Sequence, residues 1–185
     1  MSAFDDARVT LILADYIGID AGGKANIIGA GFTITGATGL PAGGIVNVAM
    51  HLLVMIDLPA KYAGKEFALG MELRDDTTGE AVKVPGPTGQ IDTMRIQQIV
   101  KGDRPVVPNV YLPEGLPIRV QMNIGFPTGI PLPAGHSLHW RVEIDGQHRK
   151  DWVAGFHLVG PPPGAVFGGF NTPTSIPPLT PPDQS

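Results

Sequence analysis

Three histidines lie close together in one short stretch, and imidazole is the side chain best suited to bind zinc or to transfer protons near neutral pH. They are His136, His139 and His148, with Asp145 and Asp151 as candidate carboxylate ligands. Zinc needs three or four ligands at about 2 Å, which are usually oriented by further hydrogen bonds. Because the stretch offers only this set, we expect exposed polar histidines and no metal site.

Other groups that support catalysis do not combine into a site. Carboxylates occur side by side at Asp5-Asp6 and Asp75-Asp76, but we expect these pairs in exposed segments, where the side chains point apart or into solvent. There is no cysteine, and no serine lies in the setting of a nucleophile elbow. The serines are Ser2, Ser137, Ser175 and Ser185. We therefore expect no catalytic residue, no cofactor and no enzymatic activity.

The histidines belong to a predicted β-hairpin that begins at Leu138. Apolar and polar residues alternate along its first arm, which gives one buried and one exposed face. Asp145-Gly146 supplies the positive-φ pair of a tight turn, and an alternating second arm returns to Leu158. Trp140 and Trp152 both fall on the apolar side. Two tryptophans can bury a large area, so this hairpin is expected to anchor the core.

The same alternation predicts strands elsewhere, and the longest apolar run, Ile45 to Leu58, is expected to be buried on one face and partly covered on the other. The predicted strands cover residues 8–16, 26–35, 45–58, 66–74, 81–84, 116–126, 138–144 and 152–158. Residues 91–100 fit neither period and are read as a loop with at most a short strand, and residues 127–135 as a turn. About eight short strands separated by turn signals predict an all-β fold, namely an antiparallel β-sandwich of immunoglobulin-like or jelly-roll-like kind.

Two glycines mark one of these strands. Gly29 and Gly31 fall on the face of residues 26–35 where side chains would be expected. Glycine in a strand often marks a bulge or a close approach by another backbone. A glycine-rich phosphate loop is the alternative, but no helix follows and no Lys-Ser/Thr pair ends the loop. We therefore predict a turn and a bulge here.

The inward positions of the strands define an expected core of mostly large apolar side chains. These residues are Leu11, Leu13, Phe32, Val48, Met50, Leu52, Leu69, Met71, Val120, Met122, Trp140, Val142, Trp152 and Phe156.

Composition limits the classes of function. The 185 residues are 43% hydrophobic and 16% charged, which is typical of one globular domain with a sparsely charged surface. A net charge of −4 argues against a nucleic-acid partner, which needs clustered Lys and Arg. The acidic start of the chain, Met1 to Asp6, does not resemble a signal peptide, and the apolar runs are too short and too polar to span a bilayer. We expect no nucleic-acid and no membrane partner.

Proline crowds the chain after the second hairpin arm, so we divide the chain into a β domain (residues 1–159) and an extended tail (residues 160–185). Such a density of proline favours polyproline conformations over a paired strand. A disordered terminus is one interpretation. The tail nevertheless carries apolar side chains that a solvated segment does not need, which indicates an arm that binds a partner. These are Val166, Phe167, Phe170, Ile176 and Leu179.

Two stretches of the chain resemble a known family. The first is Leu13 to Phe32, which contains Asp15-Tyr16-Ile17-Gly18-Ile19-Asp20, and the second is Leu132 to Gly135 followed by Trp140 to Gly146. They are similar to a family of small uncharacterised proteins from actinobacteria and their phages, built on a domain of unknown function (DUF6941-like). The resemblance spans residues 11–158. It implies a compact β domain with no assigned activity, and the proline-rich tail extends beyond the family core.

We therefore expect a non-enzymatic structural or interaction protein. In a phage, the expected function is that of a virion component, such as a capsid decoration or minor capsid protein. It would bind the major capsid protein or copies of itself, as a homo-oligomer or within the lattice. The alternatives are a phage tail protein and a cytoplasmic bacterial module that binds a ligand or a carbohydrate. For carbohydrate stacking the sequence offers only Tyr62 and Tyr111 in predicted loops.

Overall fold

The computed structural model describes residues 2–36, 44–86, 89–104, 106 and 109–160. Within them the chain is mostly β-strand, with one short helix, α1 (Ala3–Asp6), and a 3₁₀ turn, η1 (Ala60–Tyr62). The strands form several sheets, none of which closes on itself, and nearly all neighbours pair antiparallel. This confirms the predicted all-β, antiparallel class. No helix in the described residues is long and apolar enough to cross a membrane.

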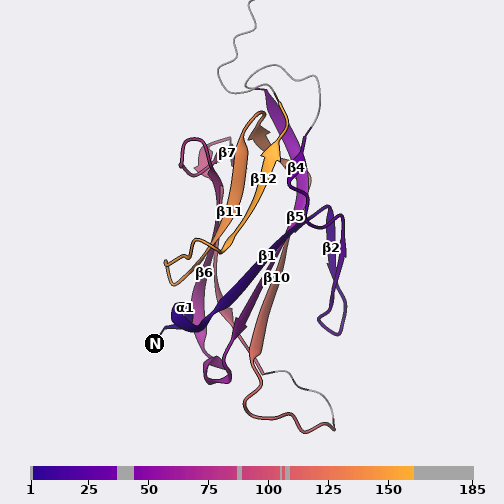
Figure 1. Cartoon of the computed structure of the whole chain (residues 1–185), viewed down its shortest axis with the longest axis vertical. Coiled ribbons are helices and arrows are strands. Elements are labelled where there is room, and N and C mark those ends of the chain that lie inside the picture. The colour runs from indigo at the N-terminus through magenta and orange to yellow at the C-terminus, as the bar shows by residue number, and fades with distance from the viewer. Residues whose placement is uncertain (1, 37–43, 87–88, 105, 107–108, 161–185) are drawn as a thin grey trace, which may run out of the picture.

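The first main sheet is built around the long apolar run. β5 (Ile45–Leu58) lies between β1 (Arg8–Ala14) and β10 (Ile118–Pro133), and both neighbours run antiparallel to it (Figure 1). Val48 and Met50 begin a row of buried side chains on one face of β5, as a period of two requires.

The second main sheet has five strands in the order β4-β12-β11-β6-β9. All of its pairs are antiparallel except β12 with β4, which run parallel. Because β9 and β4 lie at its two ends, the three central strands carry its buried face. The strands are β4 (Ile34–Thr35), β6 (Glu66–Asp75), β9 (Arg95–Lys101), β11 (Ser137–Ile144) and β12 (Val153–Leu158).

The two main sheets share one hydrophobic core. Phe126 of β10 stacks on Trp140 of β11, with ring centroids 5.6 Å apart and planes 13° apart. This contact joins the two sheets, with Trp140 inside a single cluster of buried side chains and the partly buried Phe126 packed against it. Most of the predicted core residues are buried, both tryptophans among them. The others are partly buried and pack against the cluster; they are Leu11, Phe32, Val120 and Met122.

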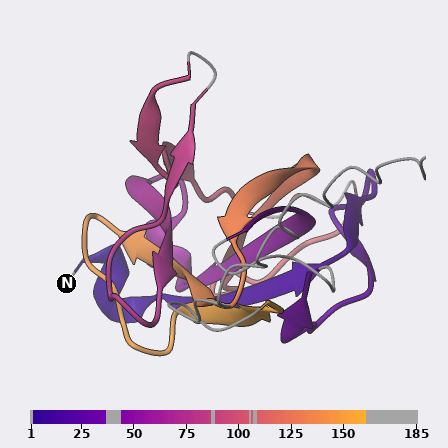
Figure 2. The same ribbon diagram turned by 90° about the horizontal axis from the view of Figure 1, so that it is seen from above.

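A small hairpin covers part of the outer face of the first sheet. β2 (Tyr16–Ile19) pairs with β3 (Ala25–Ile28), and Ile17 packs with Ala14 and Leu53 in a second, smaller cluster. The second face of β5 is therefore partly covered, as predicted. In Figure 2 this hairpin projects to one side of the sheets.

A second hairpin, β7 (Lys83–Pro85) with β8 (Ile91–Thr93), projects separately from the body (Figure 2). The strand predicted at 81–84 is therefore only partly correct. Ala81 forms a single bridge to Arg74, and the chain then leaves β6 to pair with β8.

The predicted hairpin of β11 and β12 is confirmed, with one difference in its second arm. Asp145 and Gly146 both have positive φ, 51° and 76°, and Ile144 bridges Gln147 across the tight turn. Pairing is not continuous beyond that point, because residues 148–152 leave the sheet before β12 starts. Trp152 belongs to this loop, and its side chain is nevertheless buried. Its burial was therefore predicted correctly, but its place in a strand was not.

The single strand predicted at 26–35 is wrong. β3 ends at Ile28, and β4 is a separate short strand in the other main sheet. Gly29 and Gly31 have φ of +66° and +77°, so the chain turns at both glycines. Positive φ ends the pairing here, where we had predicted a turn and a bulge within one continuous strand.

Residues 91–135 also differ from the prediction. Residues 91–100 form β8 and most of β9, where a loop was expected. β10 continues to Pro133, where a turn was expected over 127–135. Its pairing shifts between Phe126 and Ile130 and then resumes. Proline is tolerated because β10 is the edge strand of its sheet, where one side needs no hydrogen-bond donors.

Candidate functional site

The outer face of the second sheet carries a connected group of charged side chains. Along β6, β9 and β11 every second residue points away from the core, and register places these outward residues in rows across the strands. One row joins Arg95, Glu72 and Arg141, because Glu72 pairs with both neighbours. Because polar residues alternate with buried ones along each strand, three separate segments of the sequence form one polar surface.

Arginine and glutamate form a connected network on this surface. Glu72 accepts a hydrogen bond of 2.7 Å from Arg74 and one of 3.0 Å from Arg141. Glu143 accepts bonds of 2.7 Å from Arg95 and from Arg141. The two glutamates are only 6% and 7% exposed, so their charges need these partners. Each carboxylate is thus held between two arginines.

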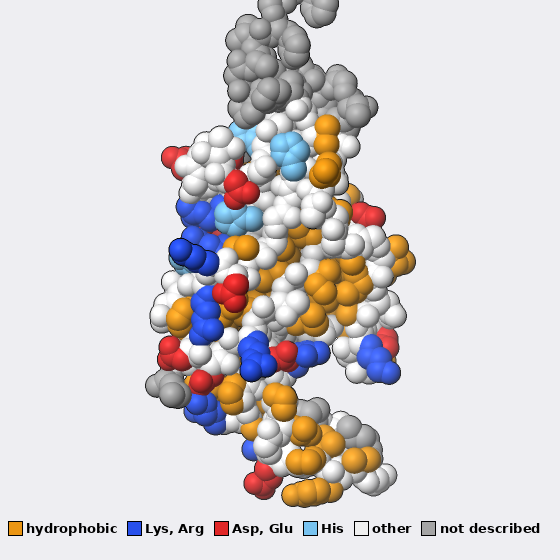
Figure 3. All heavy atoms as spheres, in the orientation of Figure 1, with side chains coloured by type: hydrophobic (Ala, Val, Ile, Leu, Met, Phe, Trp, Pro, Cys, Tyr) orange, Lys and Arg blue, Asp and Glu red, His pale blue; other side chains and the backbone are white. Residues whose placement is uncertain are grey.

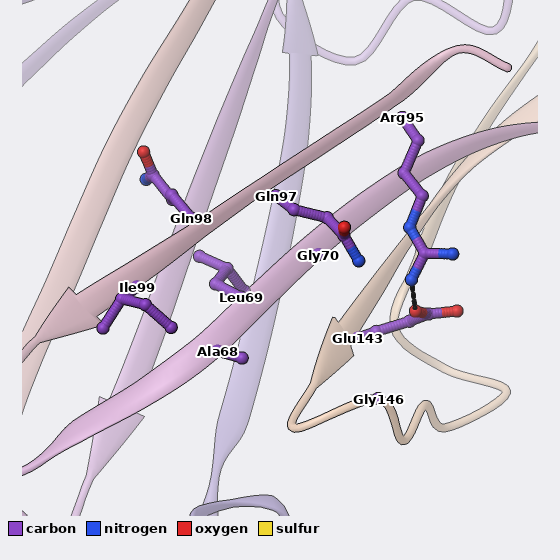
Figure 4. Close-up of a pocket in the computed structure, with 9 residues that line it drawn as sticks. All are labelled: Ala68, Leu69, Gly70, Arg95, Gln97, Gln98, Ile99, Glu143 and Gly146. Atoms are coloured by element: carbon purple, nitrogen blue, oxygen red, sulfur yellow. Dashed lines mark hydrogen bonds and ion pairs between the residues drawn. The ribbon is translucent and has the colours of Figure 1, made fainter. Parts of the chain in front are cut away.

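A shallow hollow lies beside this network, at the β9 edge of the sheet (Figure 4). Its floor is low because Ala68 and Gly70 carry little or no side chain. The Arg95–Glu143 ion pair stands on one side, and Ile99, 66% exposed, stands on the other. The hollow has no unpaired acid, so it offers space for a side chain but no evident catalytic group.

A second hollow of about 430 Å³ opens between β6, β11, β12 and the loop after the tight turn. Positive side chains dominate its lining. The lining residues are Arg74, Asp76, His139, Arg141, His148, Arg149, Lys150, Val153 and Gly155. We call it the cationic hollow. Lys and Arg side chains gather on the corresponding flank in Figure 3.

The three candidate histidines have different surroundings in the structure. His136 Nδ1 lies 2.5 Å from the carboxylate of Asp75, and His139 bonds to Asp76. His148 is exposed and lines the cationic hollow together with His139. Within the part of the chain that is described, no group of three or more His, Asp or Glu side chains could hold a metal ion. His136 and His139 therefore act here as partners of carboxylates, and His148 has no described carboxylate partner.

The prediction that Asp75 and Asp76 are both exposed is wrong for Asp75. It is 8% exposed, because it ends β6 under the turn that follows. Burial raises the pKa of its carboxyl, but the N–H of Thr77, the ring of His136 and the N–H of Thr78 together lower the pKa below its ordinary value. A carboxylate that anchors a turn in this way has a structural role.

The two tyrosines that might stack on a sugar differ in their surroundings. Tyr62 is buried, and its hydroxyl shares its one proton between the carbonyl oxygen of Ser2 at 2.7 Å and the carboxylate of Asp6 at 2.8 Å, so it is no platform. Tyr111 is 86% exposed. It belongs to a different surface, described next.

One exposed loop was suggested by the sequence only through Tyr111, as a candidate for carbohydrate stacking, and not as a protein-binding surface. Residues 102–117 join β9 to β10, and we call this segment the end loop, because its described residues (102–104, 106 and 109–117) project beyond one end of the sheets (Figure 1). Its described residues expose large apolar side chains, which form a lobe in Figure 3. They are Val106, Val110, Tyr111 and Leu116, exposed by 87%, 54%, 86% and 37%. The signal available in the sequence was a run of apolar residues and prolines with no alternation.

The partner-binding residues predicted in the tail lie outside the described residues. They are Val166, Phe167, Phe170, Ile176 and Leu179. Their role stays a prediction, as does the boundary between the β domain and the tail.

Comparison with known proteins gives no family assignment. No protein-family model matches the chain, and neither the curated proteins nor the solved structures give a significant match. The function must therefore be argued from the surfaces described above.

Proposed function

We propose that this chain is a non-enzymatic structural or interaction protein whose end loop docks on another protein. The exposed apolar side chains of the end loop carry the proposal. Val106 and Tyr111 are both more than four-fifths exposed, although each would be stabilised by burial. Single exposed apolar residues are ordinary, but a group of them on one projecting loop is typical of an interaction site.

The energy available from this loop is enough for docking. Burying one large apolar side chain contributes about 1.5–3 kcal/mol, so three or four anchors can offset the entropy lost when a loop becomes ordered. Tyrosine is also enriched among the residues that dominate protein interfaces. The end loop therefore supplies the anchors that an assembly contact needs.

The paired charges support the non-enzymatic side of the proposal. Glu72 and Glu143, the buried carboxylates of the outer face, are each held by two arginines. Asp75 has its pKa lowered, the opposite of the shift that would make it a general acid near neutral pH. In each case the carboxylate is bound by neighbouring donors within the fold.

Within this class we propose a phage virion component, such as a capsid decoration or minor capsid protein. The two main sheets with a shared core suit a β-sandwich, an architecture that can carry loops and arms at its ends. The partners would be the major capsid protein or further copies of the chain. A phage tail protein is the nearest alternative, since it would use the same kind of docking loop.

The test measures association of the full-length protein and of variants in the end loop. Sedimentation velocity over a range of concentrations detects self-association, and co-sedimentation with purified particles of the source phage detects binding to a lattice. We expect Val106→Ser with Tyr111→Ser to abolish whichever association the wild type shows. Ile91→Ser, on the β7–β8 hairpin and 61% exposed, is the matched control and should bind as the wild type does.

Two results would contradict the proposal. One is a wild-type protein that stays monomeric and does not bind the particles. The other is equal loss of binding in the control variant, because that would mean that any exposed apolar side chain serves as well as the end loop.

A further inference from the structure

We propose that the cationic hollow binds an oxyanion of the phosphate or sulfate class, carried by a small molecule. The inference is independent of docking by the end loop, because the hollow lies on the outer face of the second sheet, over β6, β11 and β12. Its basis is a local excess of fixed positive charge on a chain whose net charge is −4.

The charge of Arg149 is fixed in position without an ion pair. Its Nη2 donates to the carbonyl oxygens of Phe4 at 2.8 Å and Asp5 at 2.7 Å. Its guanidinium also lies over the rings of Phe4 and Trp152, with 5.0 Å and 5.1 Å to the ring centroids. Among the ion pairs of the described residues, Arg149 takes part in none. The carbonyl and ring contacts hold the guanidinium in place, and its positive charge can then interact with a bound anion.

Arg74 and Arg141 are held at the opposite side by the network of the sheet. Both donate to Glu72, and Arg141 also donates to Glu143. The bonds of Arg141 to these carboxylates use only Nη2, so the rest of the guanidinium is not committed to them. A side chain fixed by one partner loses less entropy when it binds a second.

The hollow has too few carboxylates to neutralise its cations. Four Lys or Arg side chains line it, and Asp76, bonded to His139, is the one carboxylate of the lining. Glu72 and Glu143 lie against two of these arginines and reduce the excess of positive charge. They do not remove it, because three carboxylates then face four cations. Arg95 adds a fifth cation to the same network. Lys150 and His148 come from the loop at the rim and take part in no described ion pair.

Geometry favours a small ligand with an oxyanion at one end. Arginine presents paired N–H donors that match the oxygens of a phosphate or sulfate group. A volume of about 430 Å³ exceeds what one such group fills, and Val153 with Gly155 gives part of the lining an uncharged surface. An organic phosphate or sulfate suits this combination better than a bare ion does.

The test titrates full-length, ¹⁵N-labelled protein with inorganic phosphate and, separately, with phenyl phosphate at constant ionic strength. We expect saturable chemical-shift changes at Trp152, whose ring lies against Arg149, and in the backbone of residues 148–155. Tighter binding of phenyl phosphate than of inorganic phosphate is the expected result, whereas equal binding would show that the site takes the free ion and would overturn the small-molecule carrier.

The decisive variant is Lys150→Glu, which reverses an exposed charge at the rim, and Lys24→Glu is its matched control on the turn of the β2–β3 hairpin. We expect about tenfold weaker binding in Lys150→Glu and less than twofold change in Lys24→Glu, at unchanged melting temperature. Absence of saturable binding by either probe would overturn the inference. Equal weakening by both variants would overturn it too, because the effect would then come from net charge and not from the hollow.

Discussion

Trp140 lies where the two main sheets meet. It is fully buried, and its ring stacks on Phe126 of the other sheet. We expect Trp140→Ala to lower the free energy of unfolding by about 3–5 kcal/mol, because it removes a large buried side chain and leaves a cavity between the sheets. Denaturant titration measures this loss. Tyr111→Ala removes an aromatic ring that is 86% exposed, and as the control it should change stability by less than about 0.5 kcal/mol.

Asp75 gives a second prediction at the same scale, because its pKa is lowered in the folded protein. A carboxyl whose folded pKa lies below its unfolded value stabilises the fold fully above the unfolded pKa of about 3.9 and loses that effect as the pH falls through the folded value. We therefore expect Asp75→Asn to cost about 1–2 kcal/mol near pH 7 and progressively less below about pH 4.

The measurement for Asp75 is the free energy of unfolding of wild type and variant between about pH 7 and pH 2. The pKa values of Asp5 and Asp6 are also lowered, by hydrogen bonds from Ser2 and from Lys61 respectively, so the wild type alone loses stability in acid from several groups. The difference between the two proteins isolates Asp75. A difference that stays constant with pH would contradict the assignment.

At the scale of elements, the turn at Gly29 decides where one sheet ends and another begins. Its φ is +66°, and an added Cβ would collide with the carboxylate of Asp15. We expect Gly29→Ala to destabilise the fold by about 1–3 kcal/mol, from backbone strain together with that collision. Gly31→Ala is the matched control, since its φ is +77° but a Cβ there meets nothing within 4 Å.

The control separates the two causes of strain. Thermal melting of both variants should show the larger loss for Gly29→Ala, with Gly31→Ala losing only the backbone contribution of about 1 kcal/mol. Equal losses would mean that Asp15 moves aside without cost and that φ alone controls the turn.

Elements with a strict period of two could be predicted from the sequence, and edge strands could be predicted only in part. β5, β6 and β11 each have one buried face, so their apolar residues alternate and reveal them. β9 and β10 lie at sheet edges, where exposed Ile99 and the tolerated proline Pro131 hide the pattern. The predictions for 91–100 and 127–135 failed for this reason.

The candidate sites were less accessible to sequence reasoning, because they depend on which strands are neighbours. Glu72 meets Arg95 and Arg141 only through the register of β6 with β9 and β11, which join distant parts of the chain. The alternation in the sequence indicates that these residues point outward, but it does not indicate which strands are neighbours and therefore which residues pair. Arg149 likewise reaches Phe4 across 145 positions of sequence.

At the scale of the whole molecule, the remaining prediction concerns the boundary between the β domain and the tail. Within the described residues, the core is built from side chains between Ala3 and Leu158, and Leu158 is fully buried at the end of β12. We expect a chain that ends at Gly160 to melt at the same temperature as the full-length protein, because it keeps every one of these core residues.

The same truncation should weaken association even though it leaves the melting temperature unchanged. Phe167 and Phe170 are the tail residues that we expect to dock, since each offers about 1.5–3 kcal/mol on burial. Full-length protein with both phenylalanines changed to serine is the companion variant, because it keeps the length and the prolines of the tail. Sedimentation velocity and particle binding should show the same loss for both proteins. A truncated chain that fails to fold would place the tail within the core. A truncated chain that binds as well as the full-length protein would leave the end loop as the docking surface on its own.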